Sequence, residues 1–277
     1  MKKIIILIAA SIACVMIFMT SCENSKPALS KVSTDGSTSM EKMMGFLGEG
    51  FENENPNISF TYNATGSSAG ISGVLEDRCD IGLASRAIKP EEKKKGLIGK
   101  TVAYDSIVVV VNRDNPIKNL SMKEIRDIFT GKIKNWKEVG GKNLEIVLIG
   151  REAGSGTRDG FESVTGIGEK SKYRQELTSA GDVITTVSGN ESSVGYVSLS
   201  SVKDSIKMIS VDGVKPSEES VRTGKYAIRR PFVFVLRKDK KVSDAAKTFL
   251  DFVETKRAQE LISRSGQVPL GEKDEQK

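Results

Sequence analysis

Short apolar runs alternate along the 277-residue chain with segments in which apolar residues recur at helical spacing. The predicted strands cover residues 31–33, 58–62, 107–111, 144–149, 194–199 and 232–236. Helical periodicity starts near Met40, Ile71 and Ser121, and a last amphipathic helix is predicted over 245–262. Strands that alternate with helices in this way are typical of α/β architecture.

The longest apolar run lies at the N-terminus. Lys2 and Lys3 precede an almost unbroken apolar run over residues 4–18, and small residues then lead to Cys22. The run is shorter than the roughly twenty residues that span a bilayer, so it predicts a signal peptide over residues 1–21.

The end of this segment resembles a bacterial lipobox, in which the cysteine is acylated and becomes the new N-terminus. The resemblance implies lipidation of Cys22, with residues 22–30 as a polar tether between membrane and domain. The alternative is an ordinary secreted protein that is cleaved nearby.

Composition excludes several classes of function. The chain contains no histidine, which rules out Ser-His-Asp and Cys-His catalysis and most catalytic zinc sites. The net charge of +6 suits an anionic ligand, but no basic block with interleaved aromatic residues predicts nucleic acid binding. Apart from Cys22, the mature chain would keep Cys79 as its only thiol, so we expect no internal disulfide.

Three turns rich in glycine and hydroxyl residues each follow a predicted strand and precede a predicted helix. They are 36–39 (GSTS), 66–68 (GSS) and 154–157 (GSGT). Backbone N–H groups at the start of a helix lack partners within the helix and attract anions. Because such turns lie on one edge of an open α/β sheet, the three could surround one small ligand.

Charged residues strengthen this prediction. Arg151 stands just before the third turn, in the stretch REAGSGTR, where its planar guanidinium suits a tetrahedral oxyanion. A fourth turn, over residues 80–86, ends in Ser85 and Arg86. A surface salt bridge is the alternative role for Arg86.

Three enzyme motifs also need to be weighed. Residues 66–70 match the G-x-S-x-G nucleophile elbow, but that elbow needs a histidine base. Residues 150–157 lack the G-K-[ST] ending of a phosphate-binding P-loop. Ser39 and Lys42 fit S-x-x-K, in which a lysine activates the serine, so a serine acyl-enzyme stays an alternative.

The chain resembles the extracytoplasmic phosphate-binding proteins that feed the high-affinity phosphate ABC transporter. The resemblance covers nearly the whole mature chain and rests most on two stretches, IRDIFTGKIKNW (125–136) and REAGSGTR (151–158). The turns at 36–39 and 66–68 and the stretches 80–86 and 194–197 add to it.

The resemblance implies a type II periplasmic-binding-protein fold, in which two α/β lobes are joined by two hinge crossings and hold the ligand in the cleft. Lobe I would comprise residues 31–111 and 229–277, and lobe II residues 112–228, with a first crossing at the turn-rich stretch 112–116. The residues expected to bind phosphate are Thr38, Ser39, Ser67, Ser85, Arg86, Arg151, Ser155, Gly156 and Thr157.

Ser85 falls where some members of this family place an aspartate. Phosphate keeps a proton at neutral pH and sulfate does not, so a carboxylate acceptor favours phosphate and repels sulfate. We therefore expect Asp105 to supply the acceptor, and also to pair with Arg86.

The resemblance further implies that the protein is not an enzyme but a lipid-anchored, extracytoplasmic monomer. It would bind phosphate and present it to a permease with its ATPase, without a cofactor, a metal or nucleic acid. Sulfate or molybdate is the alternative ligand, and the sequence does not separate transport from phosphate sensing.

Overall fold

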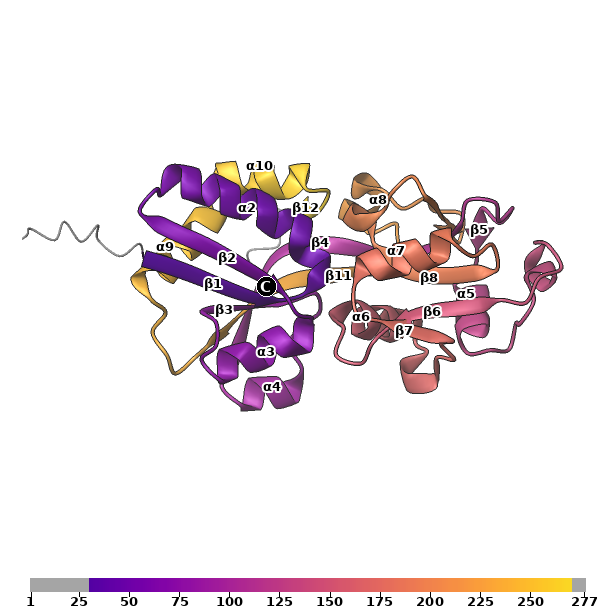
Figure 1. The fold of residues 1–277 in the computed structure, drawn as a ribbon, viewed down its shortest axis with the longest axis horizontal. Helices are drawn as coiled ribbons and strands as arrows, with labels where there is room; N and C mark the ends of the chain where they lie inside the picture. The colour runs from indigo at the N-terminus through magenta and orange to yellow at the C-terminus, as the bar shows by residue number, and fades with distance from the viewer. Residues whose placement is uncertain (1–29, 271–277) are drawn as a thin grey trace, which may run out of the picture. The chain divides into compact units, whose positions relative to one another are not determined.

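The computed structural model describes residues 30–270, apart from the side chain of Glu169 (Figure 1). The predicted signal peptide, Cys22 and most of the predicted tether lie outside these residues, and Ser30 already begins the first strand. In the described part of the chain, no helix is both long and apolar enough to cross a membrane.

Strands and helices alternate along most of the chain, as predicted. The strands are β1 Ser30–Gly36, β2 Ile58–Ala64, β3 Ile81–Ala84, β4 Leu97–Asn112, β5 Asn119–Leu120, β6 Val147–Arg151, β7 Gln175–Leu177, β8 Ser193–Ser198, β9 Ile206–Met208, β10 Ser210–Val211, β11 Arg229–Arg237 and β12 Val268–Pro269. The α-helices are α2 Glu41–Glu54, α3 Ser67–Leu75, α4 Pro90–Lys94, α5 Met122–Phe129, α6 Gly156–Thr165, α7 Ala180–Ser188, α8 Glu218–Arg222, α9 Asp244–Val253 and α10 Lys256–Arg264. The short 3-10 helices are η1 Thr38–Met40, η2 Trp136–Val139, η3 Gly168–Lys170 and η4 Leu199–Ser201.

The main strands follow the spatial order β2-β1-β3-β11-β4-β8-β6-β7. β1 and β3 are parallel, and β6 is parallel to both β7 and β8. β11 runs antiparallel between β3 and β4. Through β11, β4 and β8, these pairings make β6 run opposite to β1 and β3, so the turns that follow the carboxyl ends of β1 and β3 can face the turn that follows β6.

The longest strand, β4, belongs to two hydrophobic cores. Its first part pairs with β11 from Leu97 to Ser106, and its second part pairs with β8 from Ile107 to Val111. We define lobe I by the cores around β1 and β3, and lobe II by the core around β6 and β8. Buried residues of the lobe I cores include Val32, Met43, Phe51, Ile71, Val74, Phe232, Phe234 and Phe249. Buried residues of the lobe II core include Ile107, Val108, Val109, Phe129, Trp136, Phe161, Tyr196 and Ile228.

The lobe boundary and the last helix differ from the sequence prediction. Residues 107–111 pack in the core of lobe II, so the chain crosses between the lobes inside β4 and not at 112–116. The long helix predicted over 245–262 is two helices, because the hydroxyl of Thr255 accepts a hydrogen bond from the backbone N–H of Ala258 and starts α10 anew.

Candidate functional site

The starts of η1, α3 and α6 meet where the two lobes touch. The Ser39 and Thr157 hydroxyl oxygens, one from each lobe, lie 2.7 Å apart. The backbone N–H of Ser68 donates to the Gly154 carbonyl at 3.1 Å. The three predicted turns therefore converge, although they meet across the lobe junction and not along one edge of a parallel sheet, because β6 runs opposite to β1.

The turn before α6 lies very close to two serine hydroxyls of lobe I. The Ser155 hydroxyl caps the helix by accepting from the backbone N–H groups of Thr157 and Arg158. A Cβ on Gly156 would stand 2.2 Å from Ser67 Oγ and 2.6 Å from Ser85 Oγ. Only a glycine lets the N-terminus of α6 come this close to the two hydroxyls of lobe I.

Arg151 ends β6 with its side chain buried. Its Nε donates to the Leu177 carbonyl at 3.0 Å, and Nη2 donates to the Thr178 carbonyl at 2.6 Å. Within residues 30–270, Arg151 forms no ion pair with a carboxylate. Burial lowers the pKa of Arg151, and the positive charge of Arg230 acts in the same direction. The site thus holds a buried cation with carbonyl partners alone, an arrangement that an anion would compensate.

Asp105 does not pair with Arg86, contrary to our expectation. Its Oδ2 accepts from Nε and Nη2 of Arg230, at 3.0 and 2.9 Å, and its Oδ1 accepts from Ser198. The third nitrogen of Arg230, Nη1, donates to Ser85 Oγ at 3.1 Å. Burial raises the pKa of Asp105 and lowers that of Arg230, and the ion pair opposes both shifts.

Sequence reasoning missed Arg230. The signal was present, because two consecutive arginines precede Pro231 at the start of the strand that returns to lobe I. A charged residue at that place needs a partner on the neighbouring crossing strand, and β11 pairs Arg230 with Asp105.

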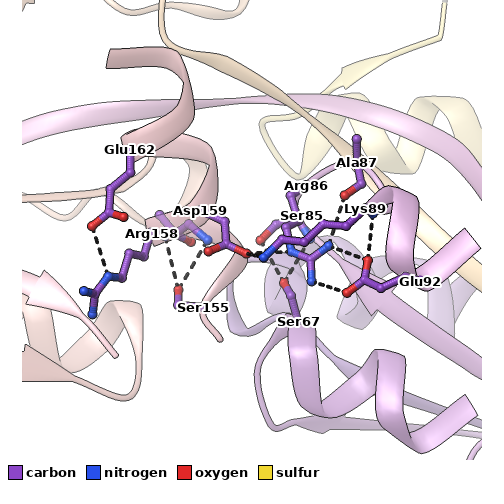
Figure 2. A network of polar contacts seen from close by, with 11 residues as sticks. Ser67, Ser85, Arg86, Ala87, Lys89, Glu92, Ser155, Arg158, Asp159 and Glu162 are labelled. Carbon is purple, nitrogen blue, oxygen red and sulfur yellow. Dashed lines mark hydrogen bonds and ion pairs between the residues drawn. The ribbon is translucent and has the colours of Figure 1, made fainter. Parts of the chain in front are cut away.

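Arg86 joins the lobes through ion pairs with carboxylates of both (Figure 2). Its Nη1 and Nη2 donate to the Glu92 carboxylate at 2.8 and 2.7 Å, and its Nε lies 2.8 Å from Asp159 of α6. Lys89 adds a second ion pair to Asp159 at 3.1 Å. All three guanidinium nitrogens lie within 2.8 Å of a carboxylate oxygen, and the role of Arg86 as a phosphate ligand stays a prediction. The salt bridge considered as its alternative role is formed, but the Arg86 side chain is only 6% exposed and so does not lie on the surface.

The remaining predicted residues fall into two groups. Ser39, Ser67, Ser85, Ser155 and Thr157 are all 2% exposed or less. Thr38 is half-buried and lines a groove together with residues 179–181 of lobe II.

The Ser39–Lys42 pair of an acyl-enzyme is not formed. Lys42 is exposed, and the hydroxyl of Ser39 contacts Thr157 instead. Among the described residues, no hydrogen bond joins Ser39 to Lys42. A serine nucleophile at Ser39 would therefore lack its base.

Comparison with known proteins agrees with this geometry. The PBP superfamily domain matches residues 22–257. The phosphate-binding protein PstS of Bacillus subtilis is 32% identical over 90% of this chain and 84% of its own length. A crystal structure from Clostridium perfringens, of a substrate-binding protein assigned to a phosphate ABC transporter and holding phosphate, has a TM-score of 0.84 and 38% identity. It is matched over 87% of this chain and 100% of its own.

An ABC-type phosphate transport receptor from Vibrio cholerae has a TM-score of 0.72 and 32% identity, over 86% of this chain and 100% of its own. These matches confirm the predicted periplasmic-binding-protein fold. Since they run along nearly the whole length of both partners, the chain belongs to the PstS family of phosphate-binding proteins, within the PBP superfamily.

Proposed function

We propose that this protein binds inorganic phosphate between its lobes and presents it to the permease of an ABC transporter. The observation that supports this most is Arg151, a buried guanidinium whose partners among residues 30–270 are carbonyl oxygens and not carboxylates. It ends β6, the strand that precedes α6, and the positive end of the α6 helix dipole adds to its attraction for an anion. Membership in the PstS family points to phosphate as that anion.

Both lobes contribute donors to the proposed site. Thr38, Ser39 and Ser67 belong to lobe I, and Ser85 follows β3 in the same lobe. In lobe II the donors are Arg151, Ser155, Gly156 and Thr157. Closure removes water from the ion and replaces it with these fixed donors, so neither lobe alone holds the ion tightly.

Closure also forms ion pairs away from the ligand. Asp159 lies one turn beyond Ser155 on α6 and contacts Arg86 and Lys89 of lobe I. Because the ligand engages the first turn of α6, phosphate binding and the formation of these ion pairs occur together. No covalent bond is made or broken, so we propose a binding protein and not an enzyme.

Titration calorimetry of the protein, freed of carried-over ligand, would test the proposal. We expect one phosphate site, and weaker binding in Ser39→Ala and Thr157→Ala because each variant loses a hydroxyl at the lobe junction. Ser188→Ala is a matched control, since its hydroxyl bonds locally to the Thr185 carbonyl on α7. No heat and no thermal shift with millimolar phosphate would contradict the proposal.

We further propose that the protein works outside the cytoplasm as a monomer, anchored through a lipid on Cys22. A labelled fatty acid should be incorporated into the wild type and not into Cys22→Ser, which should be released from the membrane. Deletion of the gene for this protein should abolish high-affinity phosphate uptake by the cell. If uptake continued while the response to phosphate starvation changed, a sensory role would replace the transport role.

A further inference from the structure

Both backbone polar groups of Arg151 are held by side chains of lobe II. The Arg151 N–H donates to the hydroxyl of Tyr196 at 3.2 Å, and the Arg151 carbonyl accepts from Nη1 of Arg158 at 3.1 Å. Strands β6 and β8 are in register at Val147 and Leu148, before Arg151 is reached. Side chains therefore take over as partners of the backbone at the end of β6, where the buried cation stands.

The hydroxyl of Tyr196 continues into a series of hydrogen bonds. It donates to the hydroxyl of Tyr173 at 3.0 Å, which donates in turn to Oε1 of Glu162 at 3.0 Å. Nε of Arg158 also donates to Oε1 of Glu162 at 3.0 Å (Figure 2). These contacts lead from one backbone group of Arg151 back to the other. We call these five residues the Arg151 network.

The Glu162 carboxylate sets the direction of the hydrogen bonds in this network. An ionised carboxylate accepts hydrogen bonds and cannot donate, and each tyrosine hydroxyl has one hydrogen to donate. Tyr173 therefore donates to Glu162, and Tyr196 must donate to Tyr173. The lone pairs of Tyr196 are then left for the N–H of Arg151. Burial raises the pKa of Tyr196 to about 12 and also raises that of Tyr173, so both hydroxyls keep their hydrogens at neutral pH.

Packing leaves the two tyrosines little freedom to move. Tyr196 is fully buried, and its ring stacks on that of Phe161 with centroids 4.2 Å apart. The ring of Tyr173 covers the backbone of Gly150, where a Cβ would stand 2.4 Å from the Cδ1 atom of Tyr173. Gly150 directly precedes Arg151, so the two tyrosines pack against both the strand and the helix that meet at the site.

The Arg151 network also ties the buried cation to α6. Arg158 and Glu162 form an ion pair four residues apart on this helix, and Ser155 caps its N-terminus. The guanidinium of Arg151 and the positive end of the α6 dipole both attract an anion. Contacts that fix one relative to the other therefore fix the shape of the lobe II half of the site.

We propose that Tyr196 and Tyr173, directed by Glu162, are positioning residues for the ligand, which hold Arg151 in place beside α6 and act on the bound anion through Arg151. This inference rests on the proposed phosphate function. It also gives a role to Arg158, the last residue of REAGSGTR, which closes the network on the Arg151 carbonyl.

Phosphate titration of Tyr196→Phe tests the proposal. The variant keeps the aromatic ring but leaves the Arg151 N–H without its acceptor, so phosphate affinity should fall by roughly 5- to 20-fold. Tyr226→Phe is the matched control, because Tyr226 is a fully buried tyrosine of the lobe II core whose hydroxyl donates to the Ile107 carbonyl. We expect Tyr226→Phe to lower the midpoint of urea unfolding and to leave phosphate affinity within about twofold of the wild type.

The double variant Tyr196→Phe/Arg151→Met separates positioning from a merely structural role. If Tyr196 acts through Arg151, adding Tyr196→Phe to Arg151→Met should change phosphate affinity by less than about twofold, because the two losses are not additive. Additive losses would overturn the inference, and so would wild-type affinity in Tyr196→Phe. No phosphate binding by the wild type would instead contradict the proposed function, and the inference with it.

Two further variants test the rest of the network. Tyr173→Phe should weaken phosphate binding by a few-fold, less than Tyr196→Phe, because the Tyr196 hydroxyl can still accept from Arg151. Glu162→Gln replaces the carboxylate by an amide that can donate to Tyr173, so the hydrogen bonds lose their fixed direction and affinity should also fall by a few-fold. Wild-type affinity in both variants would show that the network does not position Arg151.

Discussion

Arg151 and Arg230 are both buried arginines at the junction of the lobes, but they have different partners. They are 1% and 3% exposed. Arg230 has the carboxylate of Asp105 at 2.9 Å, whereas Arg151 bonds to two backbone carbonyls of lobe II. One charge is neutralised inside the protein, and the other has no carboxylate partner among residues 30–270.

Burial alone therefore does not mark an anion site. The two charges of a buried ion pair neutralise each other, and removing one member leaves the other charge unpaired. A buried cation without a carboxylate is costly in the ligand-free protein and is relieved when an anion arrives. This difference predicts opposite consequences for two substitutions of the same kind.

The largest effect is expected from Arg230→Met, which leaves the buried charge of Asp105 without a partner. The free energy of unfolding of the ligand-free protein should fall by about 3–5 kcal/mol. Urea unfolding of the wild type and the variant would measure this difference in free energy. The double variant Arg230→Met/Asp105→Leu should recover much of the loss, since no charge is then left unpaired. A double variant as unstable as the single one would contradict the ion-pair account.

Arg151→Met should instead act on binding. Truncating one partner of a buried, hydrogen-bonded charge pair costs about 2–5 kcal/mol, so phosphate affinity should fall by roughly 30- to 5000-fold. The free energy of unfolding without ligand should change less than in Arg230→Met. Arg174→Met, an exposed arginine of the same lobe, is the control. Equal affinities in wild type and Arg151→Met would remove the contrast between the two arginines.

Gly156→Ala tests whether the lobes must come together for either arginine to act. The added Cβ would meet Ser67 and Ser85, and overpacking of this kind costs about 1–3 kcal/mol. Phosphate affinity should drop by about 5- to 150-fold in calorimetry. In α2, a Cβ on Gly45 would meet no atom within 4 Å, so Gly45→Ala should leave binding almost unchanged. If both variants bound equally, the close approach would not matter.

The smallest effect is expected from a third arginine, Arg86, when its inter-lobe partner is removed. Asp159→Asn should weaken phosphate binding by only a few-fold, because Arg86 keeps the carboxylate of Glu92 and its buried charge is not left unpaired. Stopped-flow measurements should place the change in the dissociation rate. Asp251→Asn breaks an ion pair within α9 and should have no effect on dissociation.

Much of the geometry of the candidate site could be predicted because its signals are local in the sequence. Ser39, Ser67 and Ser155 each stand at a strand-to-helix turn, and the helix that follows gives their role. Arg151 could be found for the same reason. The α/β fold also followed from periodicity, since most strands are short apolar runs bounded by turns.

What could not be predicted depends on contacts between distant residues. Asp105 and Arg230 are 125 positions apart, and nothing nearby in sequence tells which arginine the carboxylate will face. The full length of β4 could not be predicted from the sequence, because polar residues before Ile107 interrupt the apolar run of this strand. The break between α9 and α10 at Thr255 could not be predicted either, because apolar residues keep their helical spacing across it.

The passage of the chain through β4 also bears on the order in which the lobes can fold. All the buried residues of the lobe II core except Val268 of β12 lie within residues 107–228, so most of this core can form as soon as that stretch is available. Lobe I is built from both ends of the described chain, and Phe51 packs against Phe249 with ring centroids 5.2 Å apart. Its first half must wait for β11, α9 and α10, and contacts so distant in sequence form slowly. Newly made or newly exported chains therefore expose the apolar face of α2 until their C-terminal segment arrives, and that interval is when a chaperone would be needed.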